Sequence, residues 1–133
     1  LARNGLPLPD VMIAESAYSI YDGRKACALL LARNAPPPTA FVCGNDILAL
    51  GALAECQARG LSVPEQVSVV GFDNIEFAAQ ADPPLTTIDG PAEEMGKSAA
   101  SYVLGHLGGD HVALHNPVEV ELILRGSSAP AGG

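Results

Sequence analysis

The sequence predicts an α/β fold, arranged as a three-layer α/β/α sandwich around a mostly parallel sheet. Short apolar runs rich in β-branched residues alternate with stretches of helical periodicity, which is the pattern of repeated βα units. The runs are almost continuously apolar, as expected for parallel strands with helices on both faces. Hydrophobic residues form 48% of the 133 residues and aromatic residues only 5%, so the core must be largely aliphatic.

Local signals set the order of the elements. The prolines at 36–38 end the first helix, Asn45 or Asp46 can cap the second, and Gly60 can close it. The predicted order is strand 10–14 (DVMIA), helix 19–33, strand 39–43 (TAFVC), helix from 45 or 46 to 59, strand 67–71 (VSVVG), short helix 75–81, strand 85–88 (LTTI), helix 91–107, loop 106–116 and strand 118–124.

The later elements have equally clear limits. Pro83 and Pro84 stop the short helix, and Pro91 opens the long one, with acidic residues in its first turn. The run 118–124 (VEVELIL) alternates with period two, so one face of this strand should meet the core while the other is wetter.

Charge and cysteine content limit the possible functions. The net charge of −8 argues against nucleic-acid contact by this segment, because phosphate binding needs clustered Lys and Arg. Cys27, Cys43 and Cys56 lie in apolar contexts without a C-x-x-C pair, which indicates buried free thiols in a reducing cytoplasm. No apolar run reaches membrane-spanning length, and the first residues resemble neither a signal peptide nor a natural start, so we expect an excised piece of a cytoplasmic protein.

Polar residues follow three of the predicted strands, at Glu15 to Tyr18, at Asn45-Asp46 and at Phe72-Asp73-Asn74. In a parallel sheet the carboxyl ends of the strands lie at one edge, where ligands bind. The sequence therefore predicts a ligand site at this edge.

The residue types in these clusters suit a sugar or another polyol. Carboxylates accept from hydroxyls and an amide both donates and accepts, so Asp73, Asn45, Asp46 and Glu15 are candidate ligand contacts. Tyr18 and Phe72 could form an apolar platform for a ring. Helix capping by the three strand-end residues and core packing of the aromatics explain the same pattern, and both interpretations stay open.

Catalytic and cofactor motifs are missing from the sequence. It contains no G-x-G-x-x-G, Walker or G-x-S-x-G motif, and it lacks the acidic pair and late Lys of a phospho-acceptor domain. His106, His111 and His115 lie with Asp110 in a polar stretch that is more typical of a solvated loop than of a metal site. We therefore expect a binding protein without catalytic residues, metal or cofactor.

One long ordered set of motifs resembles the lactose/galactose-repressor family of bacterial transcription regulators. It runs from PTAFVCGND through ALGALAECQARGLSVPEQVSVVGFDN to PPLTTI at 83–88, followed by PAEEMGKSAA and the closing LILRGSS at 122–128. The resemblance covers most of the chain from Gly23 to Ser128. It implies one lobe of a type I periplasmic-binding-protein-like fold, with 1–90 as the C-terminal lobe, 91–117 as a helix and loop of an absent N-terminal lobe, and 118–133 as closing strand and tail.

The resemblance also implies a function and a site. Asn45 and Asp73 match positions that commonly contact the effector in this family, and Tyr18 lies where an aromatic often packs on it. Many sugar-responsive members carry an arginine after the first strand of the lobe, but this chain has none between Arg3 and Arg24 and offers Glu15 instead. The effector is then a sugar or a neutral polyol, and operator DNA is bound only by a headpiece outside this chain.

Two self-association surfaces are expected. The helix at 47–56 is apolar nearly all round, and by the resemblance Leu50, Phe77 and Ala81 would lie at a dimer interface. The stripe of helix 91–107 would lack a sheet to cover it, so this helix should pack on a partner chain. The alternative function is a transport-type periplasmic sugar-binding protein.

Overall fold

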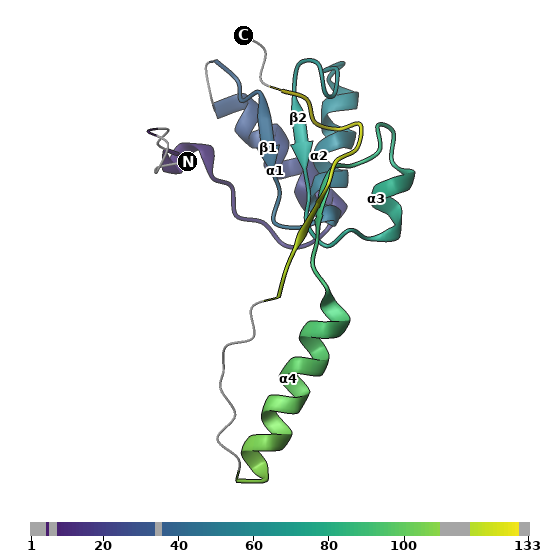
Figure 1. Cartoon of the computed structure of the whole chain (residues 1–133). Coiled ribbons are helices and arrows are strands. Elements are labelled where there is room, and N and C mark those ends of the chain that lie inside the picture. Colours follow the sequence, from purple (N-terminus) through teal and green to yellow (C-terminus); the bar gives the residue numbers. More distant parts are fainter. Residues whose placement is uncertain (1–4, 6–7, 34–35, 110–117, 131–133) are drawn as a thin grey trace.

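The computed structural model describes residues 5, 8–33, 36–109 and 118–130 (Figure 1). Its elements are η2 (Asp10–Met12), α1 (Ile20–Arg33), β1 (Ala40–Val42), α2 (Asp46–Ala58), β2 (Ser68–Val70), α3 (Glu76–Gln80), β3 (Thr87–Asp89), α4 (Ala92–Leu107) and β4 (Glu121–Ile123). We call residues 8–33, 36–90 and 121–130 the lobe. The predicted βα alternation from residue 19 onward is confirmed, with most elements one to three residues shorter than expected at one or both ends and with β3 beginning two residues later and ending one residue later than expected.

The strands form two ladders that meet at one point. β1 and β2 pair in parallel with Phe41 opposite Val69, and β3 and β4 pair antiparallel with Ile88 opposite Leu122. A single parallel bridge from Val70 to Thr86 connects the ladders. β3 and β4 therefore leave the lobe side by side and run toward α4 (Figure 1).

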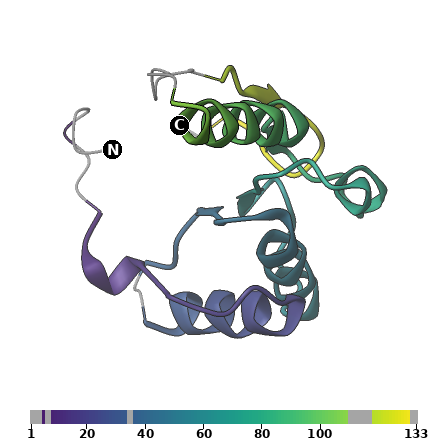
Figure 2. The ribbon, with the colours of Figure 1, turned by 90° about the horizontal axis from the view of Figure 1, so that it is seen from below.

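Helices α1 and α2 lie on the same side of β1 and β2 (Figure 2). Phe41 and Val69 are buried against this layer, together with Cys27, Ala49, Ala52, Leu53 and Cys56. The other face of β1 is bare in the described part of the chain, where Val42 is 86% exposed. The described residues thus show two layers at β1 and not the expected three, because no described helix packs over Val42.

Two glycines allow α1 and α2 to pack closely. A Cβ added at Gly51 would overlap the carbonyl oxygen of Ile20, and one added at Gly23 would overlap the carbonyl oxygen of Leu48. The backbones approach so closely that no side chain fits between the helices at these positions. One turn further along, Cys27 and Cys56 fill the same helix interface as buried free thiols.

The predicted strand at 10–14 is wrong. Asp10–Met12 form a short 3₁₀ turn in which the Met12 amide donates to the Pro9 carbonyl at 2.8 Å. A strand is stable only beside another strand, and none of the described strands pairs with these residues. Their backbone groups bond locally instead.

Helix α4 extends away from the lobe (Figure 1). None of its described residues is buried, and its apolar stripe is open to solvent at Met95, Val103, Leu104 and Leu107. The helix forms at the predicted position, and Tyr102 stacks on His106 with ring centroids 5.9 Å apart. The assignment of 91–117 to another lobe stays a prediction, and residues 110–117, with Asp110, His111 and His115, lie outside the described residues.

The close helix pair leads to a stability prediction. Gly51→Ala should lower the free energy of unfolding by about 1–3 kcal/mol, since the new methyl must push α1 and α2 apart. Gly96→Ala in α4 is the matched control, because a Cβ there meets nothing within 4 Å and Ala favours a helix. Urea unfolding of both variants checks this. Equal stability of Gly51→Ala and the wild type would show that the helices can separate without cost.

Candidate functional site

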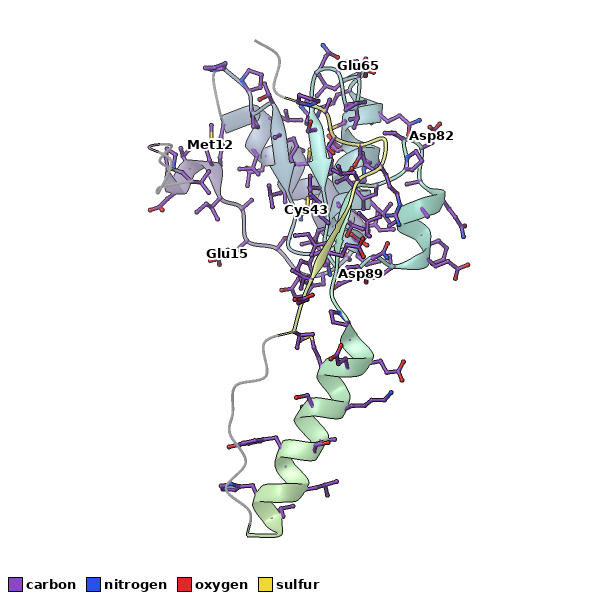
Figure 3. All side chains as sticks on the ribbon, in the orientation of Figure 1. Met12, Glu15, Cys43, Glu65, Asp82 and Asp89 are labelled. Carbon is purple, nitrogen blue, oxygen red and sulfur yellow. The ribbon has the colours of Figure 1, made fainter. Side chains whose placement is uncertain are left out.

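The three polar clusters lie together at the carboxyl ends of β1 and β2. The Asp46 amide donates to the Phe72 carbonyl at 2.8 Å, which joins the second cluster to the third. A small cavity of about 90 Å³ has Ala14 and Ser16 on one side and Cys43 and Gly44 on the other, so the first cluster lies beside the end of β1. Figure 3 shows Glu15 and Asp89 at this end of the lobe and Glu65 at the opposite end.

Asp46 is a buried connection between these segments. Its carboxylate accepts from the Thr87 hydroxyl at 2.5 Å and from the Ile75 amide at 2.9 Å, and the side chain is fully buried. A Cβ at Gly71 would overlap this carboxylate, so only glycine fits beside it. Both oxygens are thus engaged within the protein, which gives Asp46 a structural role that the sequence did not distinguish from ligand contact.

Asn45 caps α2, as one of the two sequence alternatives predicted. Its side-chain oxygen Oδ1 accepts from the Leu48 amide at 2.9 Å. The cap uses only this oxygen, so the side-chain amide Nδ2 remains as a hydrogen-bond donor at the site.

The Asp73 turn (residues 72–75) has an uncommon backbone. Asp73 has φ 103° and Asn74 has φ 49°, both in the region that favours glycine. Asn tolerates this conformation, whereas a non-glycine residue like Asp73 costs on the order of 1–3 kcal/mol there. Strain of this size persists only where the surrounding structure imposes it.

The carboxylate of Asp73 is exposed at the site. Within the described residues no group donates a hydrogen bond to it, and the expected capping of α3 by Asp73 does not occur: Ile75 is the N-cap residue and its amide bonds to Asp46. The backbone amide of Asp73 donates to the Ile88 carbonyl of β3 at 2.9 Å. The backbone is therefore fixed while the charged group is available.

The remaining candidates are exposed. Tyr18 is 75% exposed and Glu15 is exposed, and neither makes a side-chain hydrogen bond with another described residue. Phe72 is 37% exposed and its ring edge lies 3.6 Å from the point where a Cβ at Gly90 would be. Core packing is thus not the role of Tyr18, and Phe72 covers Gly90 at the exit toward α4.

Arg125 is the site residue that sequence reasoning missed. Its guanidinium donates to the Asn74 side-chain oxygen at 2.6 Å and to the Leu85 carbonyl at 2.8 Å, and its backbone amide donates to the Thr86 hydroxyl at 2.9 Å. The only signal for it was the R-x-S pattern in LILRGSS. No periodicity could have placed residue 125 beside residue 74.

The thiol beside the cavity is not activated. Burial, with smaller effects of Cys56 and Asp46, raises the pKa of Cys43 to about 12, so it stays protonated at neutral pH. In the described part of the chain no group of three His, Cys, Asp or Glu residues could hold a metal ion, and no helix is long and apolar enough to cross a membrane. The arrangement offers hydrogen bonding to a polar ligand.

Comparison with known proteins identifies the fold. The model of the periplasmic binding protein-like domain family matches residues 1–128. This chain belongs to the LacI-type periplasmic binding protein-like family. The resemblance found in the sequence is confirmed.

Two curated relatives illustrate the similarity. The HTH-type transcriptional repressor CytR of Escherichia coli (strain K12) is 42% identical over 130 residues, which cover 96% of this chain and 38% of CytR. The HTH-type transcriptional regulator MalR of Streptomyces coelicolor is 40% identical over 123 residues, covering 92% of this chain and 35% of MalR. The chain thus spans little more than a third of the length of these relatives.

Solved structures agree with this assignment. The transcriptional regulator CelR in complex with cellobiose has a TM-score of 0.87 at 30% identity, covering 96% of this chain and 39% of that chain. The transcriptional repressor AscG of Escherichia coli has a TM-score of 0.80 at 32% identity, covering 95% and 45%. The periplasmic-binding-protein-like fold of this chain is therefore supported by sequence and structure together.

The strained turn gives a prediction about stability. Asp73→Gly should leave the free energy of unfolding unchanged or raise it by up to about 2 kcal/mol, because relief of backbone strain exceeds the extra flexibility of glycine in the unfolded chain. Thermal and urea unfolding measure this. Glu65→Gly, at an exposed position without positive φ, is the matched control and should lose about 0.5–1 kcal/mol. Equal losses in the two variants would mean that the Asp73 turn is unstrained.

Proposed function

We propose that this chain is the effector-binding and dimerisation part of a cytoplasmic bacterial transcription regulator, with a sugar or related polyol as effector. The observation that carries the proposal is the exposed Asp73 carboxylate, which the fold holds in a strained turn at the strand ends. Strain kept at one polar residue is a common mark of a binding site. In this proposal a headpiece outside this chain binds the DNA, because a segment with a net charge of −8 is repelled by phosphate groups.

The proposed contacts follow from which polar atoms remain available. Asp73 accepts hydrogen bonds from ligand hydroxyls, and the Asn45 amide donates from the end of α2. Tyr18 and Phe72 supply apolar surface for the ring, and Glu15 takes the place of the arginine that many family members carry. Asp46, as a buried support, holds the turn in place. The cellobiose in the CelR structure supports the sugar class.

The mechanism is sensing without catalysis. β3 and β4 leave the site directly for α4, which we assign to a second lobe, while helices on the bare side of β1 would complete the three-layer sandwich in the whole domain. An effector that favours one arrangement of the two lobes shifts the population toward it, and DNA affinity changes with that population. No step requires a metal or cofactor.

The relatives favour a regulator over a transport-type sugar-binding protein. CytR and MalR are both named HTH-type transcriptional proteins, whereas a transport protein would carry a signal peptide. Sequencing of the region that precedes residue 1 in the whole gene distinguishes the two, since it encodes a helix-turn-helix in one case and a signal peptide in the other.

The binding prediction concerns Asp73 and Asn45. A thermal-shift screen against sugars, polyols and nucleobases identifies the effector, because a ligand that binds only the folded state raises its melting temperature. Isothermal titration should then show about ten- to hundredfold weaker binding for Asp73→Ala and a smaller loss for Asn45→Ala. Glu65→Ala, at the opposite end of the lobe (Figure 3), is the control and should bind like the wild type. Unchanged affinity in both site variants would leave these residues with structural roles only.

We also propose self-association through α2 and α3. Phe77 is 63% exposed on α3, which suits an interface anchor, while Leu50 and Ala81 are half-buried and pack on the core at its margin. The uncovered stripe of α4 is a second surface for a partner chain.

The dimer prediction is tested on the exposed anchor. Phe77→Glu should shift the chain from dimer toward monomer in sedimentation velocity, because a carboxylate would be buried without a partner. Tyr21→Glu, at a comparably exposed aromatic of α1, serves as control and should leave the distribution unchanged. A Phe77→Glu protein that sediments like the wild type would exclude α3 from the interface, and the α4 stripe would remain as the candidate.

A further inference from the structure

Arg125 lies where three segments meet. It is half-buried, and its side chain joins the Asp73 turn through Asn74 to the segment before β3 through Leu85. Among the described residues, both acceptors of its guanidinium are neutral oxygens, and no carboxylate lies within ion-pair distance. Arg125 therefore holds the Asp73 turn and the segment before β3 in place, and its charge does not neutralise a carboxylate.

The turn that Arg125 holds needs external support. Asp73 and Asn74 both have positive φ, so an isolated chain would leave this conformation. Five hydrogen bonds from the surroundings hold residues 72–75: Asp46 N to Phe72 O, Asp73 N to Ile88 O, Asn74 N to Thr87 Oγ1 at 3.4 Å, Ile75 N to Asp46 Oδ2, and Arg125 Nη2 to Asn74 Oδ1. The Arg125 bond, at 2.6 Å, is the shortest of the five, and it is charge-assisted.

We propose that Arg125 is a positioning residue for the ligand site, acting through Asn74 to hold the exposed Asp73 carboxylate in its binding orientation. The inference rests on the proposed function, since it gives Asp73 the ligand contact. It also ties the site to the chain that returns from α4, because Arg125 follows β4 by two residues. A shift of β4 against β3 would therefore move Asp73.

Amide hydrogen exchange tests the positioning without any ligand. In Arg125→Met and in Asn74→Gly, which removes the acceptor without adding strain at positive φ, the Asp73 amide should exchange about tenfold faster, while amides within α2 keep their rates. The double variant should be no faster than Arg125→Met alone, because the bond lost in Asn74→Gly is already absent from Arg125→Met. Asn74→Asp should retain the protection, since a carboxylate accepts from the guanidinium at least as well as an amide does.

Arg59→Met is the matched control. Arg59 is also an arginine held by a side-chain acceptor, Glu55, but it lies at the far end of α2 from Asn45. Its loss should leave the Asp73 amide unchanged. If Arg125→Met fails to fold, exchange of the Asp73 amide is measured in Arg125→Lys and Asn74→Gly instead.

Two results would overturn the proposal. An unchanged Asp73 amide in the Arg125 and Asn74 variants would show that the turn holds itself. Equal acceleration at Asp73 and throughout α2 would show that Arg125 only adds global stability.

A ligand experiment separates this inference from the proposed function. Any sugar or polyol that binds the wild type in the thermal-shift panel should bind about tenfold more weakly to Arg125→Met, with affinity retained in Asn74→Asp and in Arg59→Met. Wild-type affinity in Arg125→Met would contradict the positioning role. If no compound in the panel binds, the proposed function loses its support, and the exchange rates alone decide whether Arg125 positions the turn.

Discussion

The carboxylate of Asp46 accepts two hydrogen bonds on which the functional end of the lobe depends, one from the Thr87 hydroxyl and one from the Ile75 amide. Its own backbone amide donates to Phe72. One buried acid thus joins the start of α2, the Asp73 turn and β3, three segments that are separate in the sequence. A buried charge is stable only with such complete hydrogen bonding, so the three segments are held in one arrangement.

This arrangement explains why the edge proposed to bind the effector is also the connection to α4. The Asp73 turn bonds to β3 through Ile88 and Thr87, and to the chain after β4 through Arg125. These are the two strands that leave the lobe. In a two-lobe regulator, a ligand at Asp73 would therefore act on the strands that join the lobes. The direct hydrogen bonds between the Asp73 turn and these segments would be enough to transmit its effect.

Helix packing makes the rest of the lobe rigid. Gly23 and Gly51 let α1 and α2 approach until backbone meets backbone, and the pair covers Phe41 and Val69. The other face of β1 and the stripe of α4 are uncovered among the described residues. The described residues thus contain a well-packed core on one side and uncovered apolar surface on the other, in a chain that spans little more than a third of the length of the relative CytR.

The sequence by itself determined the alternation of elements from residue 19, the helix starts at Asn45 or Asp46 and at Pro91, and the two polar clusters that follow β1 and β2, because caps, prolines and periodicity act over a few residues. The tertiary structure alone decided what those clusters do. It buried Asp46 and exposed Asp73, although both are aspartates that follow a strand. It left 10–14 without a strand to pair with, and it placed Arg125 beside Asn74 at a sequence separation of 51. These outcomes depend on contacts between distant segments, and short-range patterns carry no information about which distant group will meet a given side chain.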